Sequence, residues 1–337
     1  MKRIAIVSIN ETGLGSAFRL ADILYEYDCV VFGKRGVCSD DSGARLFDSL
    51  AVELRKIYAQ FDAIVSFVAT GALIRILAPL LEDKATDPAV LAVSFDLKRV
   101  VPLIGGHLSG ANRLAAVIEE RVPDAISFVT TASEQLGRLS IDLLAAERGW
   151  RIEKLSSLAR VANMLVDARR VALYCSDAIF RSLSEYDSFS RVERAEDADL
   201  IVAVAGDYKE KAVLRPPLSI GIGCMRGSSA ESIERAVEEF LRRHDIDRRE
   251  LKTVASYSAK EDERGLLEFI ESYGVEARFF DAAQIEGVEG SFSPSAAGKH
   301  FSIKGVAEPS ALLASEYGEL LFPKEVFYST ITIAGAI

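Results

Sequence analysis

Stretches of consecutive apolar residues, rich in Val, Ile, Leu and Ala, alternate along this chain with stretches in which apolar residues recur at helical spacing. The first pattern predicts buried β-strands and the second predicts amphipathic helices. Strands that alternate with helices are typical of α/β layers built on mostly parallel sheets. We therefore predict a multi-domain α/β fold in which mostly parallel sheets are flanked by helices.

We assign residues 1–131 to an N-terminal α/β domain. The predicted strands are Arg3–Ile9, Cys29–Phe32, Ala63–Val68, Val90–Phe95, Val100–Leu103 and Ile126–Thr130. The predicted helices are Leu14–Tyr27, Phe47–Gln60, Ala72–Leu81 and Ala111–Arg121. In the last of these helices, Leu114, Val117 and Ile118 form an apolar stripe that belongs to the core.

Two further α/β regions follow, a middle region at 132–217 and a C-terminal domain at 218–337. The middle region has predicted helices at Leu139–Arg148 and Leu155–Leu165 and strands at Val171–Tyr174 and Leu200–Val204. It ends in Pro216-Pro217, which cannot continue a helix or supply a central strand, so we predict a linker at Lys209–Pro217. The predicted C-terminal elements are strands Leu218–Gly223, Thr253–Tyr257, Ala277–Phe280 and Val326–Ile333 and helices Ser229–Arg243, Gly265–Tyr273 and Glu308–Glu316.

Composition narrows the class of protein. A length of 337 residues favours two or three domains, and a net charge of −10 argues against a nucleic-acid or anionic-membrane binder. No apolar run reaches the ~20 residues of a transmembrane helix, and the first residues read as a core strand rather than a signal peptide. The four cysteines form no CxxC or Cys/His pair. We expect a cytoplasmic protein without a metal site or disulfides of its own.

Three glycine-bearing segments mark predicted strand-to-helix junctions: Gly71–Lys84, Gly105–Asn112 and Gly221–Gly227. Glycine lets backbone N–H groups approach a ligand closely, and a helix N-terminus adds positive potential. An acidic protein can hold an anionic ligand in this way.

The segment Gly221–Gly227 reads GIGCMRG, so Gly221, Gly223 and Arg226 are candidate contacts for a carboxylate or phosphate. Its spacing differs from the dinucleotide fingerprint, and no P-loop Lys-Ser/Thr pair follows. A tight structural turn is therefore an equally weighted alternative. We interpret Cys224 as a neutral, buried thiol rather than a nucleophile, since no histidine lies near it in the sequence.

The segment Gly105–Asn112 reads GGHLSGAN and contains His107, one of only three histidines. An imidazole in a loop at the carboxyl end of a strand can serve as a general base, a hydrogen-bond donor or a metal ligand. The alternative is a loop histidine whose hydrogen bonds are satisfied within the protein. Gly105 and Gly106 would bring backbone close to a ligand, and Asn112 either caps the next helix or offers its amide to a ligand.

Further candidates lie near the other strand ends. Thr70 and Gly71 open a short helix, which Thr70 would cap, and Arg75 and Lys84 are candidate anion contacts. In the C-terminal domain, Lys260 and Glu263 belong to a KEDE cluster that follows a predicted strand. Glu308 opens a helix next to Pro309, which is also good capping chemistry.

Taken together, these segments resemble the CbiG family of cobalamin biosynthesis. The resemblance rests on TGALIR, APLLEDKATDPAV and GGHLSGAN within 70–112, and on GIGCMRG, KEDERGLL and VAEPSALL at 221–227, 260–267 and 306–313. It spans nearly the whole chain, and LEDKATDPAV together with GGHLSGAN is highly specific. Met225 departs from the family pattern, because many members carry a second basic residue there.

The resemblance implies cobalt-precorrin-5A hydrolase activity, in which a ring lactone is opened and acetaldehyde is released to give cobalt-precorrin-5B. Cobalt would arrive with the substrate, so no protein metal site and no cofactor are implied. His107 or Glu308 would act as general base, with Lys260 and Arg226 holding carboxylates or the oxyanion. The remaining candidates would contact the tetrapyrrole: Thr70, Gly71, Arg75, Lys84, Gly105, Gly106, Asn112, Gly221, Gly223, Cys224 and Glu263.

Alternatives stay open at this point. The chain could bind and shield a tetrapyrrole without chemistry, or it could be an unrelated nucleotide- or sugar-phosphate-binding enzyme that uses GIGCMRG. His107 could also approach the cobalt as an axial ligand. A homodimer and transient contacts with neighbouring pathway enzymes are further expectations.

Overall fold

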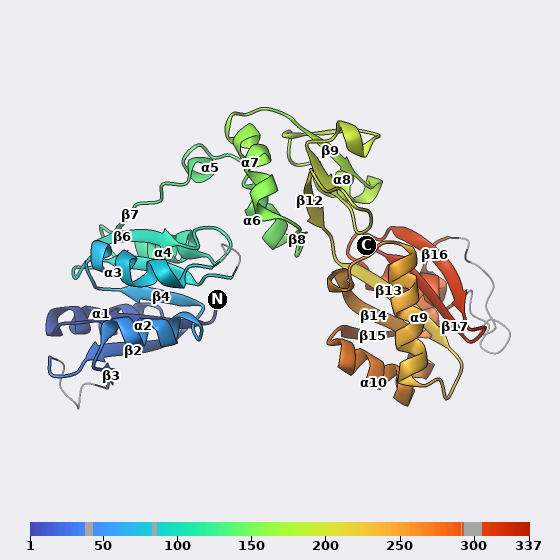
Figure 1. The fold of residues 1–337 in the computed structure, drawn as a ribbon, viewed down its shortest axis with the longest axis horizontal. Helices are drawn as coiled ribbons and strands as arrows, with labels where there is room; N and C mark the ends of the chain where they lie inside the picture. Colours follow the sequence, from blue (N-terminus) through green and yellow to red (C-terminus); the bar gives the residue numbers. More distant parts are fainter. Residues whose placement is uncertain (38–42, 83–85, 291, 293–304) are drawn as a thin grey trace. The chain divides into compact units, whose positions relative to one another are not determined.

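The computed structural model describes residues 1–37, 43–82, 86–290, 292 and 305–337 (Figure 1). The chain divides into two compact units, Met1–Leu143 and Leu144–Ile337. The described residues form three sheets, each with helices packed against it, and most strand pairs are parallel. The predicted multi-domain α/β class is therefore confirmed. Each predicted domain range contains one of the three sheets, and the boundaries between the ranges stay a prediction.

The first unit is built on a seven-stranded sheet of order β3-β2-β1-β4-β5-β6-β7. Its strands are β1 (Arg3–Ser8), β2 (Asp28–Lys34), β3 (Arg45–Phe47), β4 (Ala63–Ser66), β5 (Ala89–Val93), β6 (Arg99–Ile104) and β7 (Ile126–Ser127). Strands β1 to β5 run parallel to one another, whereas β6 runs antiparallel to β5 and β7 follows the direction of β6. The direction of β6 decides where the loop after it lies.

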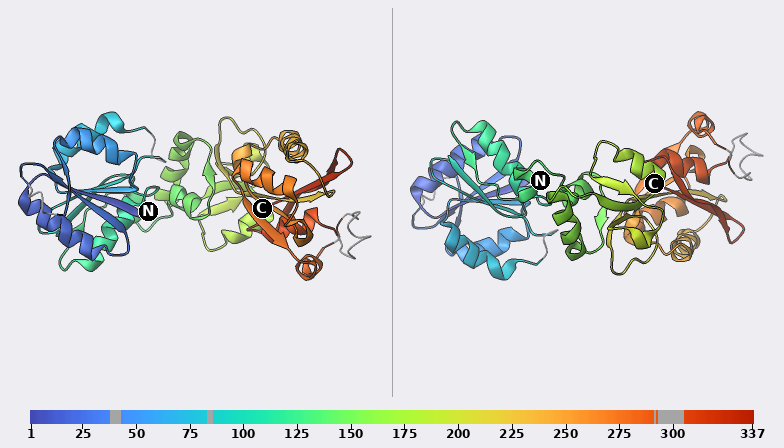
Figure 2. Two further views of the ribbon diagram at one scale, coloured as in Figure 1. Left: turned by 90° about the horizontal axis from the view of Figure 1, so that it is seen from below. Right: turned by 90° about the horizontal axis from the view of Figure 1, so that it is seen from above.

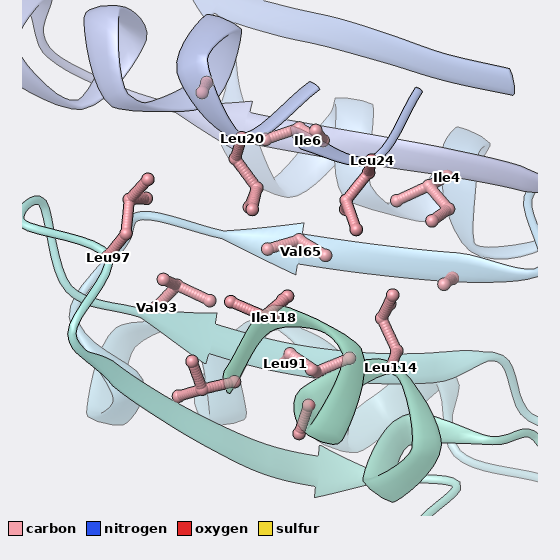
Figure 3. Close-up of a cluster of buried hydrophobic side chains, with 14 of the residues drawn as sticks. Ile4, Ile6, Leu20, Leu24, Val65, Leu91, Val93, Leu97, Leu114 and Ile118 are labelled. Atoms are coloured by element: carbon pink, nitrogen blue, oxygen red, sulfur yellow. The ribbon is translucent and has the colours of Figure 1, made fainter. Parts of the chain in front are cut away.

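Helices cover both faces of this sheet (Figure 2). They are α1 (Glu11–Ile23), α2 (Leu50–Tyr58), α3 (Thr70–Leu77) with the short η1 (Ala78–Leu80), and α4 (Ala111–Arg121). Leu20 of α1 and Ile118 of α4 meet Ile6, Val65 and Leu91 of the strands in one fully buried cluster (Figure 3). Helices α2 and α3 bury their apolar residues against the opposite face. Strands buried on both faces explain the continuous apolar runs in the sequence.

The second unit begins with a five-stranded sheet of order β10-β9-β11-β12-β8. Its strands are β8 (Arg151–Ile152), β9 (Val171–Cys175), β10 (Phe189–Arg191), β11 (Leu200–Val202) and β12 (Ala212–Arg215). Its helices are η2 (Leu155–Ser157), α7 (Leu158–Val166), α8 (Asp177–Ser182) and η3 (Ala195–Asp197). Before β8 in the chain, α5 (Ala132–Gln135) belongs to the first unit and α6 (Ile141–Glu147) spans the boundary between the units.

The predicted linker Lys209–Pro217 is wrong at its centre, because Ala212–Arg215 forms the buried strand β12 between β11 and β8. Prolines at 216 and 217 come directly after this strand and do not interrupt it. Arg215 is only 6% exposed, and its guanidinium donates to the Glu153 carboxylate and to the Ala203 and Gly206 carbonyls. Because Arg215 is charged, the sequence of this buried strand resembled that of a polar, exposed segment.

The third sheet has the order β15-β14-β13-β17-β16. Its strands are β13 (Leu218–Cys224), β14 (Leu251–Tyr257), β15 (Glu276–Phe280), β16 (Leu320–Phe327) and β17 (Ile331–Ala336). The helices are α9 (Ala230–Arg243), η4 (Arg248–Glu250), η5 (Ser258–Lys260), α10 (Arg264–Tyr273), α11 (Ala282–Gly287) and α13 (Ala307–Ala314). Helix α13 packs on one face of β13, while Phe240 of α9 contacts Phe322 and Phe327 on the other face.

The predicted single strand Val326–Ile333 is also wrong, since this range spans the turn of the β16–β17 hairpin. Tyr328 and Ser329 adopt positive φ angles of 50° and 58°. Non-glycine residues are uncommon in this region, and the sequence has no glycine, asparagine, aspartate or proline between Val326 and Ile333 to signal the turn.

Candidate functional site

Two sequence motifs of the C-terminal domain meet at one edge of its sheet. The loop Met225–Ser229 follows β13, and the segment Ser258–Glu263 follows the adjacent parallel strand β14. Arg226 joins them, because its guanidinium donates to both oxygens of Asp262 at 3.0 and 3.2 Å and to the Ala259 carbonyl at 3.3 Å. Parallel strands that end at one edge bring these distant segments together.

Glu263 makes the second link between the two motifs. One carboxylate oxygen accepts the Gly227 backbone N–H at 2.8 Å, and the other accepts the Lys260 ammonium at 3.0 Å. The side chain of Glu263 is 5% exposed and that of Lys260 is 17% exposed, whereas Arg226 and Asp262 are 65% and 70% exposed. The Lys260–Glu263 pair is therefore shielded from water, whereas the Arg226–Asp262 pair is not.

Cys224 ends β13 beside this ion pair. Burial raises the pKa of the Cys224 thiol, and the nearby Lys260 ammonium offsets that effect only in part. The thiol is consequently neutral at pH 7, as the sequence analysis predicted from the absence of a neighbouring histidine.

The two glycines within β13 face neighbouring structure. A Cβ built on Gly221 would lie 1.9 Å from the Ala307 carbonyl oxygen of α13. One built on Gly223 would lie 2.5 Å from the Thr332 hydroxyl, which donates to the Gly223 carbonyl at 3.2 Å. Close helix-to-strand packing therefore accounts for Gly221.

Glu308 lies in the first turn of α13 and is 5% exposed. The capping alternative is wrong: the N-cap residue is Val306, and a Glu308 oxygen instead accepts the backbone N–H of Lys324 in β16 at 3.2 Å. In the sheet, β16 and β14 are separated by β17 and β13. Glu308 is thus tied to the strand farthest from the one that precedes Lys260.

In the N-terminal unit, the GGHLSGAN loop folds against the turn that precedes β5. The Ser109 hydroxyl donates to the Asp87 carbonyl, and Gly105, at a φ of 69°, leaves no room for a side chain beside Ser109. His107 Nε2 lies 3.5 Å from the Ser133 hydroxyl. This loop does follow a strand, but β6 is antiparallel, so it lies at the amino edge of β4 and β5.

Asn112 does not cap α4, because the N-cap residue is Gly110 in the left-handed conformation. The Asn112 amide is 6% exposed and donates to the Thr131 hydroxyl at 3.2 Å. Its oxygen lies where a Cβ on Gly106 would come within 3.1 Å. The amide therefore packs inside the loop rather than at the helix start.

Thr70, Gly71 and Arg75 lie at the opposite edge of the same sheet, because α3 begins at the carboxyl end of β4. Thr70 is the first helical residue and Ala69 is the N-cap, so the predicted Thr70 cap is wrong. The Arg75 guanidinium folds back to donate to the Gly71 carbonyl at 2.9 Å. Lys84 lies outside the described residues. The N-terminal candidates are thus divided between two edges of one sheet.

A cavity of about 500 Å³ in the second unit was not predicted. It lies at the carboxyl ends of β9 and β11, where the strand order reverses and open α/β sheets commonly bind ligands. Three of its charged side chains have partners: the Glu319 carboxylate accepts the Ala178 backbone N–H at 2.9 Å, and Arg191 pairs with Asp177. Burial raises the pKa of the Cys175 thiol in its wall to about 12.

Acid should weaken the second unit as Glu263 becomes protonated. Burial alone would raise the pKa of this carboxyl, but the hydrogen bonds from Gly227 and Lys260 outweigh it and hold the pKa below its ordinary value. Such a group adds stability above its unfolded pKa of about 4.3 and loses it as pH falls through the folded pKa. Urea unfolding between about pH 6 and pH 3 should show a smaller loss in Glu263→Gln than in the wild type. Equal losses would contradict this assignment.

Among the residues that the structure describes, no three His, Cys, Asp or Glu side chains gather as a metal site would require. None of the helices described is both long and apolar enough to cross a membrane.

Three family models match the chain in order. Residues 53–134 match "Cobalamin synthesis G N-terminal", residues 139–215 match "Cobalamin biosynthesis central region", and residues 218–336 match "Cobalamin synthesis G C-terminus".

Curated relatives cover nearly the full length. A protein of Priestia megaterium named cobalt-precorrin-5A hydrolase is 27% identical, over 98% of this chain and 94% of its own. One of Salmonella typhimurium with the same name is 28% identical, over 94% and 93%. A crystal structure of a putative cobalamin biosynthesis protein G homolog from Sulfolobus solfataricus is 23% identical, covers 98% of this chain and 96% of its own, and has a TM-score of 0.40.

Proposed function

We propose that this chain, which belongs to the CbiG family of cobalamin biosynthesis, is a cobalt-precorrin-5A hydrolase acting in the cytoplasm. The observation that carries the proposal is the ordered match to all three family models, together with relatives of that name over more than nine-tenths of the chain. The proposed reaction opens a ring lactone and releases acetaldehyde, which leaves cobalt-precorrin-5B.

The proposed reaction requires few protein groups. Water adds to the lactone carbonyl as a base takes its proton, and the tetrahedral oxyanion then collapses with cleavage of the acyl C–O bond. A base next removes the proton of the freed hydroxyl. The carbon–carbon bond breaks, acetaldehyde leaves, and the electron pair returns to the macrocycle. Cobalt is part of the substrate throughout.

In this proposal His107 or Glu308 acts as the base, while Lys260 and Arg226 hold carboxylates or the oxyanion. His107 is half-buried and accessible in part, whereas Glu308 is buried and bonded to Lys324, so His107 is the stronger candidate. The glycine loops, Thr70, Arg75, Lys84, Asn112 and Cys224 would line the tetrapyrrole. A homodimer and transient contacts with neighbouring pathway enzymes belong to the same proposal.

The test is anaerobic incubation of the purified protein with cobalt-precorrin-5A, with acetaldehyde trapped by a carbonyl reagent. Acetaldehyde that depends on the protein supports the hydrolase, and His107→Ala, Lys260→Ala and Glu308→Ala then assign the roles. Loss of turnover with binding retained in His107→Ala supports the base, whereas loss of binding supports a cobalt ligand or anchor. A bound, spectrally shifted substrate without acetaldehyde would mean that the protein only binds and shields it.

A further inference from the structure

One buried carboxylate, that of Glu263, joins the two motifs of the C-terminal site. It is 4% exposed, and its two oxygens accept donors that come from different loops. The loops are also in direct backbone contact, because a Cβ built on Gly265 at the start of α10 would lie 2.0 Å from the Ser228 carbonyl oxygen. The position of Lys260 relative to the Met225–Ser229 loop therefore depends on Glu263.

The Lys260 ammonium has donors left over. It carries three N–H groups, and Glu263 is the one acceptor that pairs with it among the described residues. Its side chain is 17% exposed, so Lys260 is largely shielded from solvent without being fully buried. Arg226, by contrast, is exposed and engaged by Asp262. Of the two cations, Lys260 is the more shielded and the less occupied.

We propose that Glu263 is a positioning residue that fixes the Lys260 ammonium against the Met225–Ser229 loop, so that the free donors of Lys260 receive one carboxylate of the tetrapyrrole. This proposal rests on the hydrolase function above. Glu263 acts through Lys260 in this proposal, since its carboxylate is buried and each of its oxygens already accepts a donor from the protein. A lysine side chain that is already held in place loses less conformational entropy when the ligand binds, which favours recognition of a single carboxylate.

The experiment compares Glu263→Gln with Glu268→Gln, each alone and with Lys260→Ala. Glu268 is a matched control because it pairs with Arg264 on the same helix, α10, but is half exposed. Glutamine keeps an oxygen for the Gly227 N–H and loses the charge that holds Lys260. We expect Glu263→Gln to raise KM about tenfold or more while kcat changes less, since one charge-assisted hydrogen bond is worth about that factor.

In the Lys260→Ala background the effect of Glu263→Gln should vanish, because the residue acts through Lys260. If the KM increases of Glu263→Gln and Lys260→Ala multiply in the double variant, the proposal is overturned. It is also overturned if Glu268→Gln raises KM as much as Glu263→Gln does. Thermal unfolding of each variant identifies any loss that reflects misfolding.

Hydrogen exchange at the Gly227 amide tests the same contact without substrate. We expect faster exchange in Glu263→Ala and near wild-type exchange in Glu263→Gln. An unchanged exchange rate in Glu263→Ala would show that Glu263 does not hold the Gly227 amide. If the wild type releases no acetaldehyde, the proposed function fails and the substrate side of this inference fails with it, whereas the exchange result still decides whether Glu263 holds the loop.

Discussion

Replacing Gly221 by alanine is expected to destabilise the second unit by about 3 kcal/mol or more, the upper part of the range for an overpacked core. The added Cβ would lie 1.9 Å from the Ala307 carbonyl oxygen and 2.7 Å from the Ala311 amide nitrogen. Both atoms belong to the backbone of α13, so no side-chain rotation can relieve the overlap, and the helix or the strand must shift. Since Ala307, Ala311, Ala334 and Ala336 pack in this interface, such a shift also opens a buried apolar contact.

Thermal unfolding measures the effect, and at about 2–4 °C per kcal/mol the melting temperature should fall by roughly 6–12 °C. Gly287→Ala is the matched control, because it lies in a helix of the same unit and nothing stands within 4 Å of its added Cβ. A change of no more than about 2 °C in Gly221→Ala, comparable with the control, would mean that α13 yields easily.

Replacing Arg151 by alanine is expected to cost about 3–5 kcal/mol of unfolding free energy, the usual penalty for stranding a buried charge. Arg151 lies in β8 of the central sheet and pairs through its guanidinium with Glu250, which is 1% exposed in the C-terminal domain. The Trp150 indole N–H donates to the Tyr317 hydroxyl at 2.9 Å, a second contact between the middle region and the C-terminal domain. Loss of Arg151 therefore weakens the joint between two sheets as well as one ion pair.

Chemical denaturation of the full chain tests this prediction, with Arg264→Ala as control. Arg264 pairs with Glu268, but its side chain is 89% exposed, so the control should lose no more than about 1 kcal/mol. The double variant Arg151→Met with Glu250→Leu should recover most of the loss, because it removes both charges. A double variant as unstable as Arg151→Ala would show that packing, rather than the stranded charge, sets the penalty.

Long periodic segments were predicted well, and single boundary residues were not. The helix Ala111–Arg121 has the predicted ends, because its apolar stripe at 114, 117 and 118 faces the core. Caps at Thr70, Asn112 and Glu308 were wrong, since which residue caps depends on where the first helical turn begins. Strand β12 was mistaken for a linker because Glu153, the charged partner of Arg215, lies 62 residues away in the sequence.

The candidate site shows the same division. The glycine segments and the KEDE cluster were recognisable as motifs, and the i,i+3 spacing of Lys260 and Glu263 was visible in the sequence. The hydrogen bond from the Gly227 N–H to Glu263, which joins the two motifs, could not be predicted, because it links residues 36 positions apart. Neither could the reversal of β6, which places His107 and Thr70 at opposite edges of one sheet.

By itself the sequence determined the α/β class, most helices and strands, and the family, because hydrophobic periodicity and contiguous motifs are local properties of the chain. Only the tertiary structure decided which motifs meet, which glycines serve packing, and which charges are shielded. Those properties depend on strand order and strand direction. Both are set by packing between segments far apart in the sequence, and no local pattern encodes them.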